Sequence, residues 1–408
     1  MGKSKIRFKG YTEDWEQRKL GEVCSRVQGN DGRMDLPTLT ISAANGWMNQ
    51  EERFSGNIAG KEQKNYTLLH KGELSYNHGN SKLAKYGTVF SLQSYKEALV
   101  PRVYHSFKVE EGSPDFLEYY FATKLPDREL GKLISSGARM DGLLNIGYNE
   151  FMGIQMLFPS VEEQKQISNY FRTLDYLITL HQRKYDETKK LKKCMLQKMF
   201  PKEGEKVPEI RFSGFTGDWK QRKLGDVAEI IGGGTPKTSI NDYWDGEINW
   251  YAPAEIGNLI YVSSSQRKIT KLGLNKSSAK ILPVGTVLFT SRAGIGKTAI
   301  LACEGCTNQG FQSIVPRKGM LDSYFIFVRT EELKRYAETV GAGSTFVEVS
   351  GKQMMDMELM LPITIEEQQK IGNYFAEIDS LITFHQQKCD ELKNIKKFML
   401  QNMFVSEK

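Results

Sequence analysis

The chain has 408 residues and a formal net charge of +7, and 26% of its side chains are charged. This length suffices for two or three domains, each with its own core. No apolar run approaches the roughly 20 residues that span a bilayer, and the polar start MGKSKIRFKG differs from a signal peptide, so we expect a cytoplasmic protein without membrane contact. Five scattered cysteines without a framework indicate reduced thiols.

The first 23 residues contain a segment that occurs twice. Residues 6–23 return at 210–227 with 13 of 18 identities and an offset of 204. Phe8, Trp15 and Leu20 predict a clasp packed against helix ends, without catalytic chemistry. A charged linker between prolines precedes the second copy, so residues 202–227 combine the linker with the repeated segment.

Two dissimilar globular regions follow the two copies of this segment, at residues 24–158 and 228–361. Each contains short strands, such as 87–91 and 286–290, and many glycines. Each also has a helix near its end, at 116–123 and 323–329. The predicted fold class is therefore mixed α+β, with two globular domains.

Positive charge gathers in matching segments of the two regions. Between Arg267 and Lys318 there are nine basic residues and one acidic residue, and between Lys71 and Lys108 there are six and two. Neither region is basic as a whole, which argues against a general coating of phosphates. Each region is instead expected to turn one face to a polyanion.

A long helix is predicted at the end of each half, at residues 159–201 and 362–408. Residues 162–200 and 366–404 share 24 of 39 positions at the same offset of 204. Ser160-x-x-Glu163 and Thr364-x-x-Glu367 fit capping boxes, and Pro201 stops the first helix. Such a repeat sets the architecture of the whole chain.

Apolar residues recur at 4-3 spacing on both helices and form a heptad seam. Two such seams predict that the helices bury each other in an intramolecular coiled coil, parallel or antiparallel. His181 and His385 occupy matching positions of the two seams. A role as polar residues that fix the register of the helices is favoured over a role as a pH-sensitive pair. The seam residues are Ile167, Phe171, Leu174, Ile178 and His181 in the first helix and Ile371, Phe375, Ile378, Ile382 and His385 in the second.

Two segments resemble motifs of enzymes or metal sites, but each lacks residues that its motif requires. Gly294-Ile-Gly-Lys297-Thr298 resembles a phosphate-binding P-loop, but Ser291 stands where the first glycine is required. A glycine-rich loop that presents Arg292 and Lys297 to nucleic acid is favoured instead. Cys303-x-x-Cys306 lacks a second pair of zinc ligands. We therefore predict no catalytic residue and no metal site.

Several motifs together resemble the specificity (S) subunits of type I restriction–modification systems. These are the repeated Asp-Trp-x-Gln-Arg-Lys-Leu-Gly, the helix motifs Glu-Glu-Gln and Ile-x-Asn-Tyr-Phe, and, in the second half, Gly234-Thr235-Pro236 with Trp250-Tyr251-Ala252-Pro253. The resemblance covers nearly all 408 residues. The first region departs from it, with Gln28-Gly29-Asn30-Asp31 in place of Gly-Thr-Pro, which suggests a different subclass of target recognition domain.

The resemblance implies a non-catalytic subunit whose two globular regions each read one half of a bipartite site in double-stranded DNA. The helices would form an antiparallel spacer that sets the gap between half-sites and docks two modification subunits for adenine N6 methylation. Two motor–nuclease restriction subunits would complete the complex. S-adenosylmethionine, ATP and magnesium would be bound by these partners, and no cofactor by this chain. The alternative is a scaffold that pairs two protein-binding modules.

Loop residues with basic, amide or hydroxyl side chains are the candidate DNA contacts. Arg can read guanine, Asn or Gln can read adenine, and Lys meets phosphate. In the first region the candidates are Asn77, Asn80, Lys82, Lys85, Arg102 and Arg139. In the second region they are Ser291, Arg292, Lys297, Asn308, Gln309, Gln312, Ser344 and Thr345.

Overall fold

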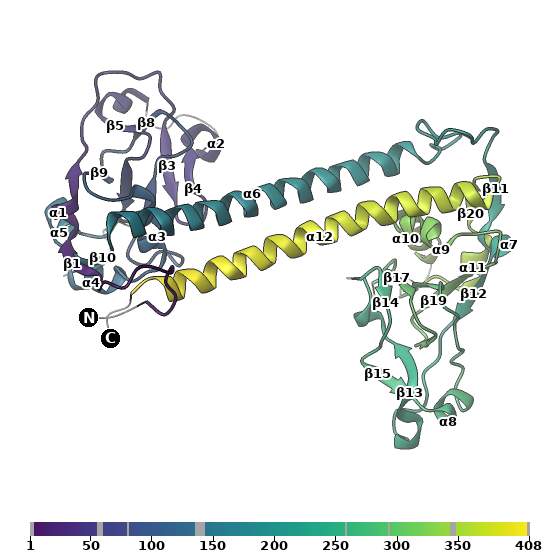
Figure 1. Cartoon of the computed structure of the whole chain (residues 1–408). Coiled ribbons are helices and arrows are strands. Elements are labelled where there is room, and N and C mark those ends of the chain that lie inside the picture. Colours follow the sequence, from purple (N-terminus) through teal and green to yellow (C-terminus); the bar gives the residue numbers. More distant parts are fainter. Residues whose placement is uncertain are drawn as a thin grey trace. The chain divides into compact units, whose positions relative to one another are not determined.

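The structure is a computed structural model that describes residues 4–54, 60–79, 81–134, 143–257, 259–292, 294–342 and 348–405. The chain divides into two compact units: unit 1 comprises Met1–Gln182 and Gln387–Lys408, and unit 2 comprises Arg183–Gln386. Two long helices, α6 (Val161–Lys198) and α12 (Ile365–Met403), each begin in one unit and end in the other (Figure 1). Each unit therefore holds one globular domain and part of both helices.

The domain of unit 1 is built mainly from short antiparallel strands. A four-stranded sheet has the order β2-β9-β6-β7, and three further strand pairs, β1-β10, β3-β4 and β5-β8, accompany it. The strands are β1 (Glu16–Lys19), β2 (Cys24–Arg26), β3 (Leu39–Ser42), β4 (Gly46–Asn49), β5 (Thr67–His70), β6 (Leu74–Asn77), β7 (Thr88–Ser91), β8 (Glu97–Val100), β9 (His105–Val109) and β10 (Gln155–Phe158). The helices are α1 (Leu20–Val23), α2 (Gln50–Phe54), the 3-10 turn Gly60–Asn65, α3 (Pro114–Ala122), α4 (Asp127–Lys132) and α5 (Tyr148–Met152).

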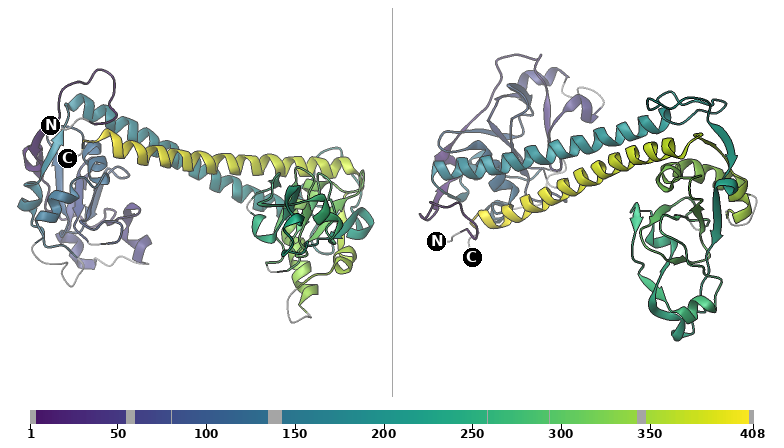
Figure 2. Two further views of the ribbon diagram at one scale, coloured as in Figure 1. Left: turned by 90° about the horizontal axis from the view of Figure 1, so that it is seen from below. Right: turned by 45° about the vertical axis from the view of Figure 1, so that its right-hand side comes forward.

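The two long helices run antiparallel within unit 1. Phe171 on α6 lies 5.9 Å, between ring centroids, from Phe404 just beyond α12, and further along α6 the backbone carbonyl of Ile178 lies 3.9 Å from the thiol sulfur of Cys389. Within unit 1, residue numbers therefore rise along one helix as they fall along the other, which can be followed by colour in Figure 2. Phe171 also joins the core of the domain, where its ring lies 5.0 Å from that of Tyr119 on α3.

Unit 2 has a larger sheet system. A five-stranded sheet has the order β12-β19-β16-β17-β14, a three-stranded sheet has the order β15-β13-β18, and β11 pairs with β20. The strands are β11 (Lys220–Lys223), β12 (Ala228–Gly232), β13 (Trp244–Tyr251), β14 (Tyr261–Val262), β15 (Arg267–Ile269), β16 (Val287–Phe289), β17 (Thr298–Leu301), β18 (Cys306–Thr307), β19 (Gln312–Pro316) and β20 (Glu358–Leu361). The helices are α7 (Leu224–Val227), the 3-10 turns Asn241–Tyr243 and Pro253–Glu255, α8 (Lys271–Asn275), α9 (Ser323–Val328), α10 (Thr330–Gly341) and α11 (Gly351–Asp356).

The helices of unit 2 are also antiparallel. The ring of Phe375 on α12 lies 6.1 Å from that of Phe200, which follows the end of α6, and Asp379, one turn later on α12, pairs with Lys192 on α6. Phe375 is fully buried in the core of its own domain. The mixed α+β fold predicted from the sequence is therefore confirmed, and so is the antiparallel direction of the helices that the resemblance implied.

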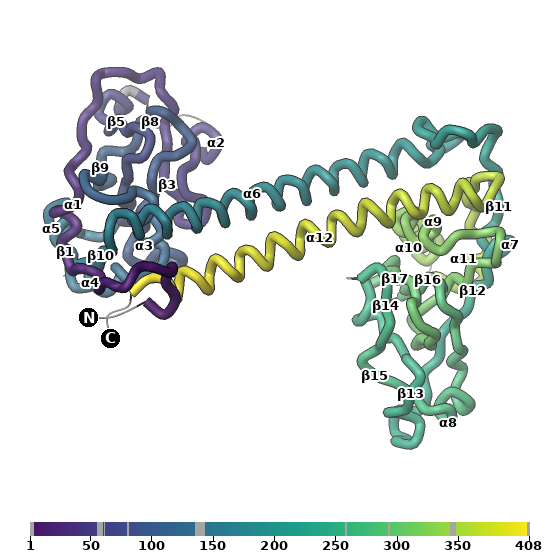
Figure 3. Tube along the Cα trace, in the orientation of Figure 1, coloured from purple at the N-terminus to yellow at the C-terminus, as the bar shows by residue number. Residues whose placement is uncertain are grey.

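The repeated segment packs against the helix ends in unit 1. The backbone N–H of Ile6 donates to the carbonyl of Asn402 at 3.0 Å, and Arg7 donates two hydrogen bonds of 2.7 Å to the carboxylate of Glu163. Trp15 is buried against Phe404, with ring centroids 6.2 Å apart. Figure 3 shows this segment lying along the end of α12.

The same contacts recur in unit 2 at matching positions. The N–H of Ile210 donates to the carbonyl of Lys198 at 2.8 Å, and Arg211 donates to both carboxylate oxygens of Glu367 at 2.7 and 2.8 Å. Trp219 is buried against Phe200. The repeat in the sequence is thus a repeat of specific contacts.

The predicted capping boxes are only half correct. The hydroxyls of Ser160 and Thr364 accept from the backbone N–H of Glu163 and Glu367, each at 3.3 Å. The two carboxylates, which were expected to bond the backbone at the helix start, instead bind Arg7 and Arg211. A guanidinium offers a charged, two-pronged donor, which a buried carboxylate prefers to one backbone N–H.

A glutamine near the start of each long helix holds the backbone of its domain. Gln164 accepts from the N–H of Ser113 at 3.1 Å and donates to the carbonyl of Pro159 at 3.0 Å. Gln368 accepts from the N–H of Asp322 at 3.1 Å and donates to the carbonyl of Met320 at 3.1 Å. Both glutamines are buried.

The seam is buried against different surfaces along its length. Its first three members on each helix, including Leu174 and Ile378, belong to the cores of the globular domains. Further along, Ile178, His181 and Ile382 are half-buried, whereas His385 is buried. Across the described ranges, no helix combines the length and the apolar character needed to cross a membrane.

Candidate nucleic-acid interface

In unit 1 the candidate residues lie on the loop between β6 and β7 and on the turn after β8. Gly87 closes this loop with a φ of +83°, and a Cβ there would lie 2.5 Å from the carbonyl oxygen of Asn77. The glycine therefore permits a close approach that another residue would block. Lys82, Lys85 and Arg102 are all exposed on these loops.

His78 brings the separate loops of this domain together. Its Nδ1 lies 2.7 Å from the carbonyl oxygen of Leu144, and its Nε2 lies 2.9 Å from that of Val103. The N–H of Leu144 in turn donates to the carbonyl of His78 at 2.8 Å. The loop with Lys82 and the turn with Arg102 are thus joined around one buried ring.

The side chain of Asn77, one of the candidate DNA contacts, forms hydrogen bonds within its own domain. Its side-chain N–H donates to the carbonyl of Ile41 at 3.2 Å, and its side-chain oxygen accepts from the N–H of Gly79 at 3.0 Å. These bonds shape the loop that carries the lysines. Asn80 and Arg139 lie outside the described residues.

In unit 2 the candidate loop connects β16 to β17. The hydroxyl of Thr290 accepts from the N–H of Lys297 at 2.9 Å and donates to the carbonyl of Gly294 at 2.7 Å, which closes the loop on itself. Gly294 has a φ of +103°, a conformation that glycine adopts without strain. Lys297 is exposed. The motif is a hairpin loop rather than a phosphate-binding loop, because a strand and not a helix follows it.

A second loop with Asn308 and Gln309 lies beside this hairpin. The N–H of Ser291 donates to the carbonyl of Gly310 at 2.8 Å, and Asn308 accepts from the N–H of Gly310 at 2.8 Å. Gln309 is exposed and accepts from the hydroxyl of Thr235. Arg292 lies 3.9 Å from the carboxylate of Glu348. The bonds to Gly310 thus place the loop that carries Arg292 beside the loop that carries Asn308 and Gln309.

The prediction that Ser291 contacts DNA is wrong, because its side chain is fully buried with 0% exposure. Gln312 is half-buried, and its side-chain oxygen lies close to Gly351. Ser344 and Thr345 lie outside the described residues. Burial of Ser291 follows from its place two residues beyond β16, a strand that is buried throughout, and from its backbone bond to Gly310.

The exposed cations of the loops differ from those of the helices in their partners. Lys82, Lys85, Arg102 and Lys297 form no ion pair with another residue in the part of the chain that the structure describes. On the helices, in contrast, Lys192 pairs with Asp379 at 2.6 Å, and Lys396 pairs with Asp175 at 2.5 Å. These loop cations are therefore exposed and without an acidic partner among the described residues, as contact with phosphate requires.

The sequence prediction omitted a further basic group in unit 2. Arg267, Lys271, Lys276 and Lys280 are exposed on β15, on α8 and in the residues after α8. Arg267 lies over the ring of Trp244, with its guanidinium carbon 3.6 Å from the centroid. Their clustering in the charge count was the signal that could have found them.

The comparisons with known proteins agree with this architecture. The family model described as "Type I restriction modification DNA specificity domain" matches residues 216–394. The MjaIX specificity subunit of Methanocaldococcus jannaschii, a type I restriction enzyme subunit, is 37% identical over 191 residues, which are 46% of this chain and 44% of that subunit. The putative MjaX specificity subunit of the same organism is 24% identical over 97% of this chain and 94% of its own length. The second half of this chain therefore matches the domain of type I specificity subunits, and the chain is similar over nearly its whole length to one such subunit.

The likeness to type I specificity subunits extends to the whole fold. A crystal structure of the S subunit of a type I restriction–modification system from M. genitalium aligns over 100% of both chains, with a TM-score of 0.63 and 12% identity. At that identity the likeness concerns the fold alone. By sequence, the chain spans less than half of the MjaIX specificity subunit and nearly all of the MjaX one.

Proposed function

We propose that this chain is the non-catalytic DNA-specificity subunit of a type I restriction–modification complex, with one target recognition domain in each unit. The observation that carries this proposal is a repeated frame that holds two dissimilar domains, each with unpaired cations on its loops. The pair Arg7–Glu163 recurs as Arg211–Glu367, so a buried contact of the frame is duplicated together with its sequence. A protein that recognises two different half-sites requires a duplicated frame and two domains that differ from each other.

The proposed target is double-stranded DNA with two half-sites separated by a fixed gap. Lys82, Lys85, Arg102 and Lys297 would meet phosphates, whereas Arg292 and Gln309 are the candidates for reading base edges. The 38 residues of α6 correspond to a length of about 57 Å. A continuous helix with residues in both units is what the proposed spacer requires.

The long helices are the proposed docking surface for two modification subunits, with restriction subunits joining the assembly. Large apolar side chains are exposed on α12: Leu381 and Phe384 in unit 2, and Ile395 and Phe398 in unit 1. Leu191, which matches Ile395 in the repeat, is also exposed. Exposed apolar side chains gathered on a helix are typical of a protein-binding surface. S-adenosylmethionine, ATP and magnesium would be bound by the partners, not by this chain.

Mapping of methyladenine tests the proposal directly. The chain is expressed with its modification subunit in a host free of DNA methylation, and modified adenines are mapped across the genome. The expected result is a two-part motif with a constant gap. Methylation without a sequence motif, or at one uninterrupted motif, would refute the proposal and favour a scaffold for protein-binding modules.

Exchange of one domain sharpens the test. Replacing residues 24–158 with the corresponding region of another family member should change one half of the motif and leave the other half unchanged. Replacing residues 228–361 should have the reciprocal effect. A change in both halves from a single replacement would contradict the assignment of one half-site to each domain.

A substitution on the helices tests the docking surface. Phe384→Asp and Phe398→Asp place charges on exposed apolar positions without changing the cores of the domains. Co-purification of the modification subunit should fall steeply, while hydrogen exchange in both globular domains stays unchanged. Leu259→Asp, at an exposed apolar position outside the helices, is the matched control.

A further inference from the structure

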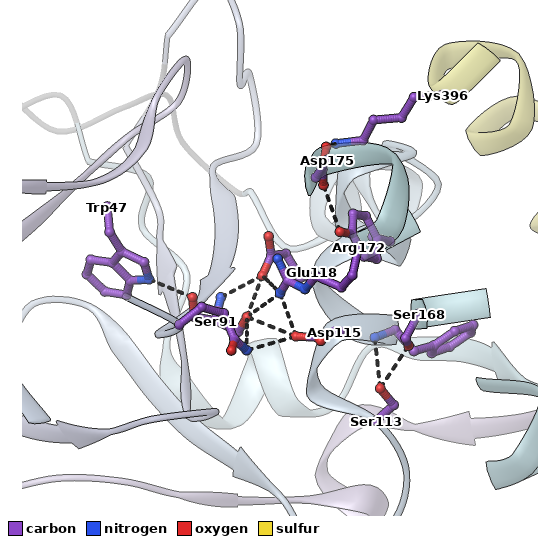
Figure 4. Close-up of polar contacts among 12 residues, drawn as sticks. Trp47, Ser91, Ser113, Asp115, Glu118, Ser168, Arg172, Asp175 and Lys396 are labelled. Carbon is purple, nitrogen blue, oxygen red and sulfur yellow. Dashed lines mark hydrogen bonds and ion pairs between the residues drawn. The ribbon is translucent and has the colours of Figure 1, made fainter. Parts of the chain in front are cut away.

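In each unit, one aspartate of a long helix is held from two sides. Asp175 on α6 accepts from the hydroxyl of Tyr119 on α3 at 2.7 Å and from Lys396 on α12 at 2.5 Å. Figure 4 shows Lys396 reaching Asp175 across the two helices. The aspartate therefore joins the globular domain and both long helices at one point, and we call this contact a tyrosine–aspartate–lysine junction.

Unit 2 contains a second junction of the same kind. Asp379 on α12 accepts from the hydroxyl of Tyr324 on α9 at 2.9 Å and from Lys192 on α6 at 2.6 Å. Asp379 and Lys192 match Asp175 and Lys396 in the repeat, at the offset of 204. The aspartate and the lysine thus belong to the duplicated frame.

The tyrosines, in contrast, do not match. The helices α3 and α9 are aligned by their N-caps, Ser113 and Asp322, whose backbone N–H groups are bound by Gln164 and Gln368. Tyr119 lies six residues after its cap, and Tyr324 lies two residues after its cap. Two dissimilar domains therefore reach the same carboxylate from different positions, which is not expected of residues retained only by duplication.

Burial favours the protonated, hydrogen-bond-donating hydroxyl of the tyrosine in each junction. Burial, followed by the charge of the neighbouring aspartate, raises the pKa of Tyr119 and of Tyr324 well above the usual value for tyrosine. Each hydroxyl therefore remains a donor to a charged acceptor, one of the stronger classes of hydrogen bond.

Each domain thereby gains a second attachment to the same helix. The first attachment is the glutamine that binds the N-cap, and the second is the aspartate 11 residues later, about 16 Å along the helix. The apolar contacts of Phe171 and Phe375 with the domain cores are non-directional, so the polar attachments are what favours one angle. Two separated attachments fix its angle on the helix pair.

Unit 1 strengthens its attachment with a residue that unit 2 lacks. Arg172 on α6 pairs with Glu118 on α3 at 2.9 Å and also with Asp115, and it donates to the hydroxyl of Ser91 at the end of β7 (Figure 4). The matching residue on α12 is Ala376. Both units thus share the glutamine attachment and the junction, whereas the pairs of Arg172 belong to unit 1.

We propose that the two junctions are positioning sites that hold each recognition domain at one angle on the helices and so restrict the DNA gap to a single length. This inference rests on the proposed function. Successive base pairs are about 3.4 Å apart along the duplex, so rocking that moves the reading loops by that distance admits a gap that is one base pair longer or shorter.

The test removes the two hydroxyl groups and keeps the rings. Tyr119→Phe, Tyr324→Phe and the double variant are expressed with the modification subunit, and methyladenine is mapped. Both half-site sequences should remain, while sites with a gap one base pair off should gain roughly tenfold in relative methylation, the effect of losing one hydrogen bond to a charged group. Tyr176→Phe, at an exposed position on α6, is the matched control and should leave the gap unchanged.

The outcomes separate this inference from the proposed function. Variants that keep the single gap of the wild-type chain would overturn the role of the junctions, while the bipartite motif would still stand. A uniform fall of methylation at all sites, without new gaps, would mean that the tyrosines only stabilise the fold and would also overturn it. Asp175→Asn keeps an acceptor for Tyr119. It should therefore increase methylation at sites with a longer or shorter gap less than Asp175→Ala does. A wild-type chain without a bipartite motif would instead refute the proposed function.

Discussion

The substitution Arg7→Ala should expose how strongly the repeated segment stabilises unit 1. Glu163, its partner, has a side chain that is 1% exposed, and its carboxylate accepts two hydrogen bonds of 2.7 Å from Arg7. Removal of the guanidinium leaves a buried carboxylate without its counter-charge. Breaking a buried pair in this way costs about 3–5 kcal/mol.

The double variant distinguishes the lost attraction from the cost of the stranded charge. In Arg7→Ala with Glu163→Gln, the neutral amide no longer needs a counter-ion, so the loss of stability should be smaller than in Arg7→Ala alone. If the double variant were as unstable as the sum of the two single variants, the stranded charge would not be the cause.

Hydrogen exchange measured by mass spectrometry locates the effect. Backbone amides at the start of α6 should exchange faster in Arg7→Ala, and peptides of unit 2 serve as the internal reference. Arg211→Ala is the matched variant and should be milder, because the Nε1–H of Trp219 still donates to Glu367 at 3.3 Å. An equal loss of protection in both units after Arg7→Ala would refute the reasoning.

Three further outcomes are expected. Burial raises the pKa of Cys306 to about 12, so its thiol stays protonated near pH 8 and should resist alkylation, whereas the exposed Cys303 should react; mass spectrometry of labelled peptides measures both. Lys297→Ala should lower the slope of log binding constant against log salt concentration by about one, without changing the DNA motif. Gly87→Val should destabilise the domain of unit 1, because its Cβ would collide with the carbonyl oxygen of Asn77, and loss of protection confined to β6 and β7 would be the sign.

The sequence predicted the frame well because the frame is periodic and repeated. The 4-3 spacing of apolar residues predicts one buried face on each long helix. Phe171 and Phe375 lie on these faces, and both are fully buried in the structure. The partner of Glu163 could not be predicted, since it lies 156 residues away in the chain and no local pattern links it to Arg7.

The loops were harder to predict than the helices. Ser291 and Arg292 are neighbours in a glycine-rich loop, yet one is fully buried and the other is half-exposed. That difference depends on the bond from Ser291 to the carbonyl of Gly310 and on the end of a buried strand. Sequence composition locates a basic loop, but long-range backbone pairing decides which side chains leave it.

The hydrogen bonds from Gln164 and Gln368 to backbone atoms have a consequence for how such a chain can evolve. Each amide binds backbone atoms, the N–H of Ser113 and the carbonyl of Pro159 in one case and those of Asp322 and Met320 in the other. Main-chain atoms are the same whatever residues a gene encodes. A different domain needs only to place the N-cap of its helix beside the glutamine amide. Recombination between related genes can therefore exchange whole domains while this contact with the helix is retained.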